Sequence, residues 1–236
     1  MSDARTQQLA DRLAAVRERI GAACAAAQRP VDDVRLVVVT KYFPAADVQR
    51  LAGLGVVDIG ESRDQEAAAK LADLPGSVRE HLRVHFIGQI QSNKARHIAA
   101  YADLVQSVDR TKVLAPLARG ALERGRVLPV FLQVDLAGDD EGRGGVLPAQ
   151  LPALADAAAT TEGLDLVGLM AVAPLHADPA AAFERLATLS QQVHEDHPGA
   201  TLISAGMSGD LEQAVAAGAT HLRVGSAILG DRPARR

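Results

Sequence analysis

The chain has 236 residues, of which 48% are hydrophobic and 23% charged, and its formal net charge is −4. This composition is typical of a folded globular protein and excludes the disordered and membrane-spanning classes. A surface that tracks phosphates normally carries a basic excess, so the charge gives no reason to expect a nucleic-acid partner. Because no Pro/Gly/Ser-rich linker divides the sequence, residues 1–236 are expected to form one domain.

The N-terminal segment is expected to form a helix. Its charged residues between positions 3 and 19 recur at helical spacing, which excludes an ordinary secretory signal, and no apolar run approaches membrane-spanning length. The single cysteine, Cys24, lies in the alanine-rich part of this segment and has no intramolecular disulfide partner. We therefore expect a cytoplasmic protein without a membrane partner, in which Cys24 is a small packing residue and not a reactive thiol.

Beyond this helix, short apolar runs alternate with longer amphipathic ones. The apolar runs predict strands at 35–41, 56–59, 84–87, 104–107, 130–135, 166–170, 201–204 and 221–224. The amphipathic runs predict helices at 45–52, 63–73, 93–100, 111–124, 148–160, 179–195 and 209–217. Alternating strands and helices pair in parallel, and about eight such units in roughly 200 to 250 residues make a closed (β/α)8 barrel. The alternative is an open doubly wound sheet, but no GxGxxG turn follows the first strand.

Lys41, at the end of the first strand, is the first candidate for chemistry. It follows the run Leu36-Val37-Val38-Val39-Thr40, whose valines favour a buried strand. A lysine at the mouth of a core is partly desolvated, which disfavours the ammonium and makes the amine available to condense with a carbonyl. Lys41 is therefore a Schiff-base candidate. The alternative is a lysine that marks the strand end and reaches the solvent.

The ends of the seventh and eighth strands predict a phosphate site. They read SAGMSGD at 204–210 and RVGSAILG at 223–230. Barrels of this kind place their chemistry at the C-terminal ends of the strands and often bind phosphate after the last two. Each segment puts glycine and serine before a helix, where free backbone N–H groups can cradle an anion. The alternative is that each segment merely caps its helix.

Arg223 brings a permanent charge close to the barrel axis, because alternation places it on the opposite face from Leu222 and Val224. Burying a guanidinium is costly unless it meets an acceptor. One acceptor would be a ring nitrogen that the guanidinium keeps unprotonated. The other would be a carboxylate on the barrel rim.

Two further patterns predict no site. His81 and His85 are four residues apart, but the strand expected at 84–87 keeps them from sharing a helical face, so no metal site is expected. The acidic, glycine-rich segment at 138–145 lacks the context of a phosphate loop and the spacing of a calcium loop. It is expected to be a surface loop.

Six segments of the chain resemble, in the same order, those of the pyridoxal-phosphate homeostasis protein family. These are the YggS-like single-domain proteins, whose barrel is similar to the N-terminal domain of alanine racemase. The segments are VVTK at 38–41, IGES at 59–62, HFIGQIQSNK at 85–94, GLM at 168–170, SAGMS at 204–208 and RVGSAILG at 223–230. The third is especially specific. The resemblance implies a (β/α)8 barrel of the alanine racemase N-terminal-domain type, with an extra N-terminal helix.

The same resemblance implies a cofactor and the residues that hold it. Lys41 would carry pyridoxal 5′-phosphate (PLP) as an internal aldimine, and Arg223 would approach the pyridine nitrogen. The residues that would line the phosphate site are Ser204, Gly206, Met207, Ser208, Gly225 and Ser226. Members of the family commonly have asparagine at position 62 and threonine at position 226, where this chain has Ser62 and Ser226. Serine keeps the hydroxyl at position 226, whereas the shorter Ser62 reaches less far toward the cofactor.

Two functions from different classes fit these expectations. The resemblance implies a PLP-binding protein that buffers, carries or delivers the cofactor to recipient apo-enzymes and so maintains vitamin B6 and amino-acid pools. The second function is an amino-acid racemase of the alanine racemase type. Such a racemase needs a second base, a tyrosine from an additional domain, and the chain ends shortly after its eighth strand with only Tyr42 and Tyr101 available.

We therefore favour the non-catalytic binding role, with a monomer as the expected state. A class I aldolase that uses Lys41 directly is a third interpretation. It explains neither the paired phosphate turns nor the motif matches.

Overall fold

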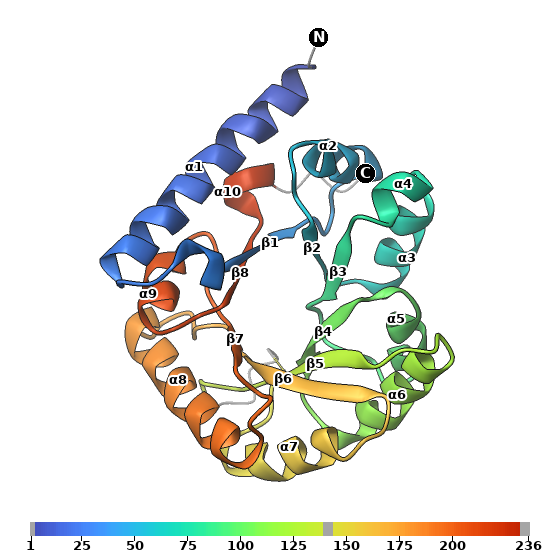
Figure 1. Ribbon diagram of the computed structural model, residues 1–236, viewed down its shortest axis with the longest axis vertical. Coiled ribbons are helices and arrows are strands. Elements are labelled where there is room, and N and C mark those ends of the chain that lie inside the picture. The colour runs from blue at the N-terminus through green and yellow to red at the C-terminus, as the bar shows by residue number, and fades with distance from the viewer. Residues whose placement is uncertain (1–2, 139–143, 232–236) are drawn as a thin grey trace.

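Eight strands form a closed barrel in the computed structural model, which describes residues 3–138 and 144–231 (Figure 1). The strands are β1 Arg35–Val39, β2 Asp58–Glu61, β3 Arg83–Phe86, β4 Leu104–Val108, β5 Leu128–Gln133, β6 Leu164–Met170, β7 Leu202–Ser204 and β8 His221–Val224. Each strand pairs in parallel with the next, and β8 closes on β1 with Val37 opposite Arg223. The predicted (β/α)8 barrel is confirmed. The centre of the acidic loop expected at 138–145 lies outside the described residues.

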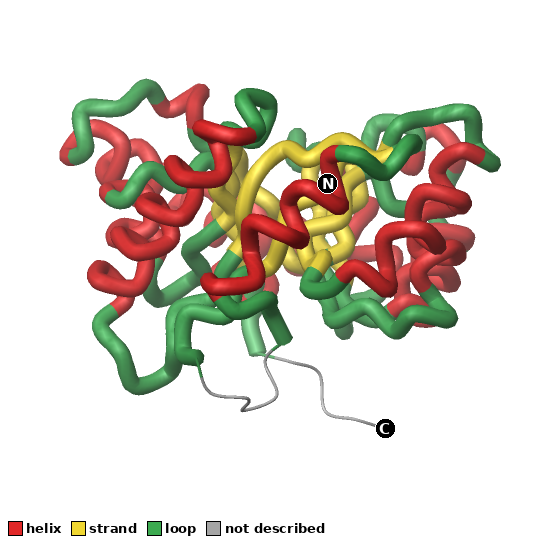
Figure 2. Tube along the Cα trace, turned by 90° about the horizontal axis from the view of Figure 1, so that it is seen from below, coloured by secondary structure: helices red, strands yellow, loops and turns green. Residues whose placement is uncertain are grey.

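Helices surround the strands on the outside, as the side view shows (Figure 2). They are α1 Ala4–Ala26, α2 Ala45–Gly53, α3 Asp64–Ala72, α4 Gly76–Arg79, α5 Ala95–Tyr101, α6 Leu114–Leu122, α7 Leu151–Ala159, α8 Pro179–Asp196, α9 Leu211–Ala216 and α10 Ser226–Leu229. Single 3-10 turns at Val31–Asp33, Thr111–Val113 and Pro148–Gln150 precede β1, α6 and α7. Helix α4 was not predicted from the sequence, because four residues are too few to show a helical period.

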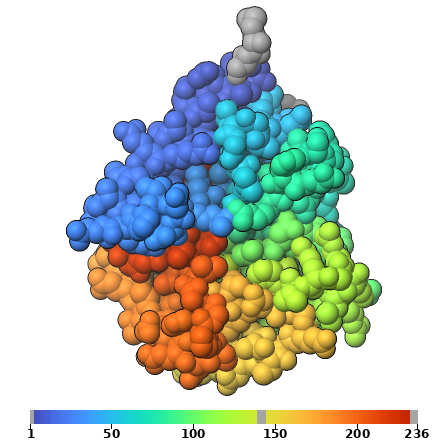
Figure 3. Space-filling model, in the orientation of Figure 1, coloured from blue at the N-terminus to red at the C-terminus, as the bar shows by residue number. Residues whose placement is uncertain are grey.

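The expected N-terminal helix is α1, which packs across α2, α9 and α10. It buries Leu9, Leu13, Val16 and Ile20, whose spacing of three and four residues places them on one face. The helix therefore packs against both the first and the last helices of the barrel. In the space-filling view the blue first segment lies directly against the red last one (Figure 3). Cys24, near the end of α1, is fully buried, in agreement with a packing role. Within the described residues, no helix is both long enough and apolar enough to span a membrane.

The strand boundaries differ from the predicted ones by at most two residues. The difference that matters most is at β1, which ends at Val39 and not at Lys41. The Thr40 N–H makes a last interstrand bond to the Gly60 carbonyl at 3.0 Å, and the Phe43 N–H then closes a turn on the Thr40 carbonyl at 3.1 Å. Lys41 consequently lies in a tight turn between β1 and α2.

Candidate cofactor site

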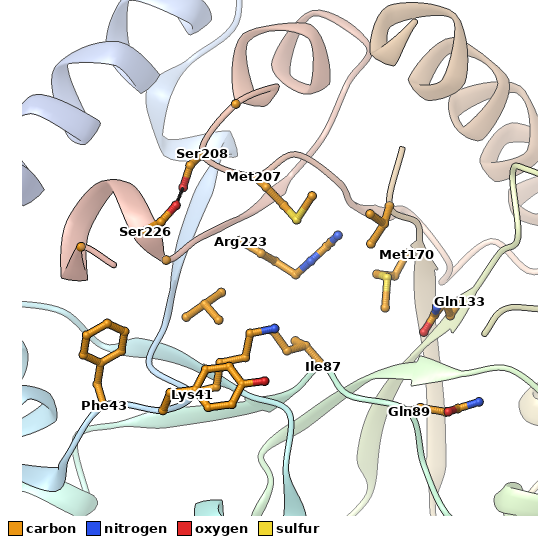
Figure 4. A pocket seen from close by; sticks show the side chains of 16 residues that line it. Lys41, Phe43, Ile87, Gln89, Gln133, Met170, Met207, Ser208, Arg223 and Ser226 are labelled. Carbon is orange, nitrogen blue, oxygen red and sulfur yellow. Dashed lines mark hydrogen bonds between the residues drawn. The ribbon is translucent and has the colours of Figure 1, made fainter. Parts of the chain in front are cut away.

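A cavity of about 480 Å³ opens at the C-terminal end of the barrel (Figure 4). Its wall includes six of the predicted site residues, namely Lys41, Met207, Ser208, Arg223, Gly225 and Ser226. Figure 4 shows Lys41 and Arg223 extending into the space between the Ser208–Ser226 pair on one side and Gln89, Gln133 and Met170 on the other. The fold therefore brings an amine, a guanidinium and two hydroxyls to one cavity.

The turn that carries Lys41 has an uncommon backbone conformation at the next residue. Tyr42 has φ of 72°, in the left-handed region that a non-glycine side chain rarely adopts. Its backbone N–H donates to the Glu66 carboxylate, which lies on α3. Such a conformation persists where the surroundings over-determine it. The hydrogen bond from this turn to α3 therefore helps to hold the lysine-bearing segment in place.

A buried ion pair lies beneath the same turn. The Lys70 ammonium is 2.7 Å from Glu61 Oε1 and donates to the Thr40 carbonyl at 2.8 Å, and the Thr40 hydroxyl donates to the same Glu61 oxygen at 2.6 Å. Lys70 is 6% exposed and Glu61 is fully buried. Burial raises the pKa of the Glu61 carboxyl, and the charge of Lys70 opposes that rise. This cluster ties β1, β2 and α3 together directly behind Lys41.

The sequence did not predict this pair, although Glu61 lies at a strand end and Lys70 lies inside the helix predicted at 63–73. One signal was available, because Lys70 lies between Ala67 and Leu71, which α3 buries against the barrel. A lysine on the buried stripe of a helix needs a partner.

The turns after β7 and β8 are hydrogen-bonded to each other. The Ser226 hydroxyl donates to the Ser208 hydroxyl at 3.2 Å, and Ser208 Oγ also accepts the Ala227 N–H at 3.3 Å. Gly225 lies close to β1, since a Cβ there would come within 3.2 Å of the Val39 carbonyl oxygen. The turns after β7 and β8 thus form one polar wall of the cavity, with hydroxyls from both sides.

Arg223 points into the barrel, as alternation predicted. It is 4% exposed, and it donates to Ser204 Oγ at 2.6 Å and to the Ala171 carbonyl at 2.8 Å. Desolvation lowers its pKa to about 10, and the charge of Asp210 opposes this shift. Among the described residues Arg223 forms no ion pair, so the alternative of a rim carboxylate partner has no support there.

Three sequence candidates lie away from the cavity. Ser204 is fully buried beneath it and contacts Arg223, and Gly206 is packed in the turn behind it. Ser62 lines a neighbouring cavity of about 480 Å³ together with Lys94. The structure thus assigns Ser62 to a different recess from Lys41.

Several residues on the cavity wall were not predicted. They include Tyr42, Phe43, Ile87, Gln89, Gln133 and Val172. Gln89 lies inside the motif at 85–94, and Gln133 is the last residue of β5, so their proximity to strand ends was the available signal. Neither the motif nor the strand pattern says toward which side such a residue points.

The fold and the cavity define a class of protein, a (β/α)8 barrel with a lysine after the first strand and serine-bearing turns after the last two. The alanine racemase N-terminal domain is a family whose sequence profile matches residues 12–233. The pyridoxal phosphate homeostasis protein of Mycobacterium tuberculosis is 41% identical over 251 residues, which cover 98% of this chain and 95% of that protein. That of Pseudomonas aeruginosa is 40% identical over 227 residues, covering 95% of this chain and 96% of that protein. The chain therefore belongs to the pyridoxal phosphate homeostasis protein family, as its motifs predicted.

Solved structures agree with this assignment. A protein from Bifidobacterium adolescentis has a TM-score of 0.89 at 31% identity, covering 97% of both chains. PipY from Synechococcus elongatus, solved with PLP bound, has a TM-score of 0.80 at 35% identity, covering 94% of this chain and all of that one. Alanine racemase from Corynebacterium glutamicum has a TM-score of 0.64 at 14% identity and shares the fold alone.

Proposed function

We propose that this protein binds PLP in the cavity at the C-terminal end of the barrel, as a Schiff base with Lys41. In this proposal the protein is a cytoplasmic monomer that buffers the cofactor and delivers it to recipient apo-enzymes, and it acts in vitamin B6 and amino-acid homeostasis without catalysis of its own. The names of its relatives and the PLP bound in PipY support this interpretation.

The observation that carries the proposal is the arrangement of three chemical groups along one cavity (Figure 4). PLP has an aldehyde, a ring nitrogen and a phosphate, which would meet Lys41, Arg223 and the Ser208–Ser226 wall. The lysines of the sequence are Lys41, Lys70, Lys94 and Lys112. Of these, Lys41 lines the cavity, whereas Lys70 is held in its buried ion pair. The residues present therefore fit the cofactor.

Each group has a separate task in this proposal. The Lys41 amine condenses with the aldehyde and releases water, which makes retention covalent and reversible. The serine hydroxyls donate to the phosphate. The Arg223 guanidinium donates to the ring nitrogen and keeps it unprotonated, which weakens the cofactor as an electron sink and favours holding it over turning over amino acids.

The Schiff base is tested by absorption spectroscopy. We expect PLP-loaded protein to show a visible band that Lys41→Ala loses, while Lys112→Ala, an exposed control, retains it. Borohydride reduction followed by peptide mapping should place the label on Lys41. A label on Lys94, or an undiminished band in Lys41→Ala, would contradict the assignment.

The phosphate wall is tested by dialysis of loaded protein. Charge-assisted hydrogen bonds contribute roughly 1.5–3 kcal/mol each, so pyridoxal without its phosphate should be retained far more weakly than PLP. Gly225→Glu should abolish retention, because it adds bulk and negative charge to this wall, and Ser226→Ala should weaken it. Equal retention of pyridoxal and PLP would show that the phosphate lies elsewhere.

The biological role is tested by transfer. Loaded protein mixed with an apo-form of a PLP enzyme should restore that enzyme's activity, whereas the Lys41→Ala variant prepared in the same way should not. A coupled racemisation assay on the loaded protein separates the alternative. Sustained racemisation of an amino acid that Lys41→Ala abolishes would favour the racemase over the carrier.

A further inference from the structure

A continuous set of hydrogen bonds runs through the inside of the barrel below the cofactor cavity. It passes from Arg223 through Ser204, Gln106 and His85 to Asp58, which belong to five different strands. The successive donor–acceptor distances are 2.6, 2.7, 2.8 and 2.8 Å. All five residues are at most 6% exposed, so water does not compete for these bonds.

The placement of the Gln106 amide between Ser204 and His85 gives this chain one direction. A guanidinium can only donate, so the bond from Arg223 uses a lone pair of the Ser204 hydroxyl. The Ser204 hydrogen then points to Gln106 Oε1. The amide nitrogen of Gln106 consequently faces His85 Nδ1, which must accept. His85 is therefore neutral, with its hydrogen on Nε2.

The carboxylate end imposes the same direction. Asp58 can only accept, so His85 must donate from Nε2. The other oxygen of Asp58 accepts from Arg83 at 2.9 Å and from Arg35 at 3.3 Å. Asp58 and His85 line a cavity of about 540 Å³ at the N-terminal end of the barrel. The chain thus connects the two ends of the barrel, and the donor that Asp58 requires at His85 Nε2 agrees with the acceptor that Gln106 requires at Nδ1.

We propose that Ser204, Gln106, His85 and Asp58 are positioning residues that hold Arg223 in the cofactor cavity through a hydrogen-bond chain with a single direction. Asp58, at the opposite end of the barrel, thereby sets whether the Ser204 hydroxyl can donate to Gln106 while it accepts from Arg223. The inference about the chain stands on the protein alone. Its effect on the cofactor rests on the function proposed above.

The substitution Asp58→Asn tests the direction. Arg35 and Arg83 donate to one oxygen of Asp58, so the asparagine oxygen should remain facing them and its NH2 should face His85. His85 Nε2 must then accept, and its hydrogen moves to Nδ1. Gln106 turns its amide to accept from Nδ1 and to donate to Ser204. The Ser204 hydroxyl then accepts from Gln106 as well as from Arg223, and its hydrogen loses the acceptor that Gln106 provided. The hydroxyl has to turn to find another acceptor, which weakens the bond that it accepts from Arg223.

The first measurement uses cofactor-free protein. Nitrogen-15 NMR of histidine-labelled protein should show His85 in the Nε2–H form in wild type and in the Nδ1–H form in Asp58→Asn, with the signal assigned by its loss in His85→Gln. Asp33→Asn is the matched control, because Asp33 lines the same cavity and loses the same charge without bonding to His85. It should leave the His85 form unchanged.

The second measurement uses PLP-loaded protein. Asp58→Asn should shift the visible absorption band and weaken PLP retention about tenfold, as expected for loss of one hydrogen bond to a charged group, while Asp33→Asn should do neither. Ser204→Ala removes the acceptor directly and should give the same band shift. Adding Asp58→Asn to Ser204→Ala should then change the band no further, whereas a merely structural effect of Asp58→Asn would add to it. Ser204→Ala, which changes the other end of the chain, serves by itself if Asp58→Asn folds poorly.

The outcomes separate the two proposals. An unchanged His85 form in Asp58→Asn overturns the directed chain. A changed form with an unchanged band and unchanged retention overturns its control of Arg223. Wild-type protein that binds no PLP overturns the proposed function, while the NMR result on the same protein still decides whether the chain exists.

Discussion

Gly206 and Gly225 occupy similar places in the sequence, but their surroundings give them different roles. Gly225 lines the cofactor cavity and approaches Val39. Gly206 has φ of 90°, and a Cβ there would lie 2.6 Å from the Ala214 Cβ and 2.8 Å from a Leu222 methyl group. Gly206 is therefore needed for the packing of the turn against α9 and β8. Its contact with the phosphate stays a prediction.

This difference predicts the effect of Gly206→Ala. An alanine at this position would be strained by the left-handed backbone, and its methyl group would overlap with Ala214 and Leu222. The variant should therefore lose about 2 kcal/mol or more of unfolding free energy. Gly209→Ala is the control, because a Cβ at that position would meet no other atom within 4 Å and the backbone there has no positive φ. Urea unfolding measures both. Equal stability of Gly206→Ala and wild type would contradict the packing role.

At the scale of elements, the lysine-bearing turn depends on α3. Lys70 on α3 neutralises Glu61 on β2 and donates to the Thr40 carbonyl, next to Lys41. A buried pair of this kind is not by itself a large source of stability, because both charges lose their hydration. Its specific effect is to hold the end of β1 against α3. We infer that the pair fixes the direction from which Lys41 enters the cavity.

Removing one partner tests this role. Lys70→Met should cost about 3–5 kcal/mol of unfolding free energy, because it leaves the Glu61 carboxylate buried without a cation. The double variant Glu61→Leu/Lys70→Met should recover a large part of that loss. Thermal and urea unfolding give the comparison, and PLP retention gives the effect on Lys41. A Lys70→Met variant as stable as wild type would refute the assignment.

At the scale of the whole molecule, the barrel closes around an interior that is polar on its axis. His221, on the closing strand β8, is 5% exposed and lies with its ring 6.0 Å from that of His85 and 5.3 Å from that of Phe131. Desolvation lowers its pKa from 6.5 to about 3, and the positive charges of Arg35 and Arg223 act in the same direction. The folded barrel therefore holds a neutral histidine where the unfolded chain would hold a charged one.

This burial predicts a pH dependence of stability. Between pH 6.5 and about pH 3 the unfolded chain binds a proton at His221 that the folded protein does not, so the unfolding free energy falls as the pH falls. The slope from this group is at most about 1.4 kcal/mol per pH unit. His221→Phe should reduce the slope in urea unfolding series, and His176→Phe, an exposed control, should keep it. An unaltered slope in His221→Phe would exclude the contribution.

The sequence by itself determined the barrel, the extra helix and the family, and six of its site candidates line one cavity at the strand ends. These depend on local patterns: the alternation of strand and helix periods, the valines before Lys41, and the glycine and serine turns after β7 and β8. Each pattern is contained within a few neighbouring residues, so it can be recognised without knowing the fold.

Only the tertiary structure decided which side chains meet. Ser204 turns toward Arg223 and not toward the phosphate wall, Lys70 reaches Glu61, and His85 and Gln106 join a chain that spans the barrel. These contacts connect strands and helices that are far apart in the sequence. Their partners are set by the register and tilt of the strands when β8 closes on β1, which is a property of the complete barrel and of no single segment.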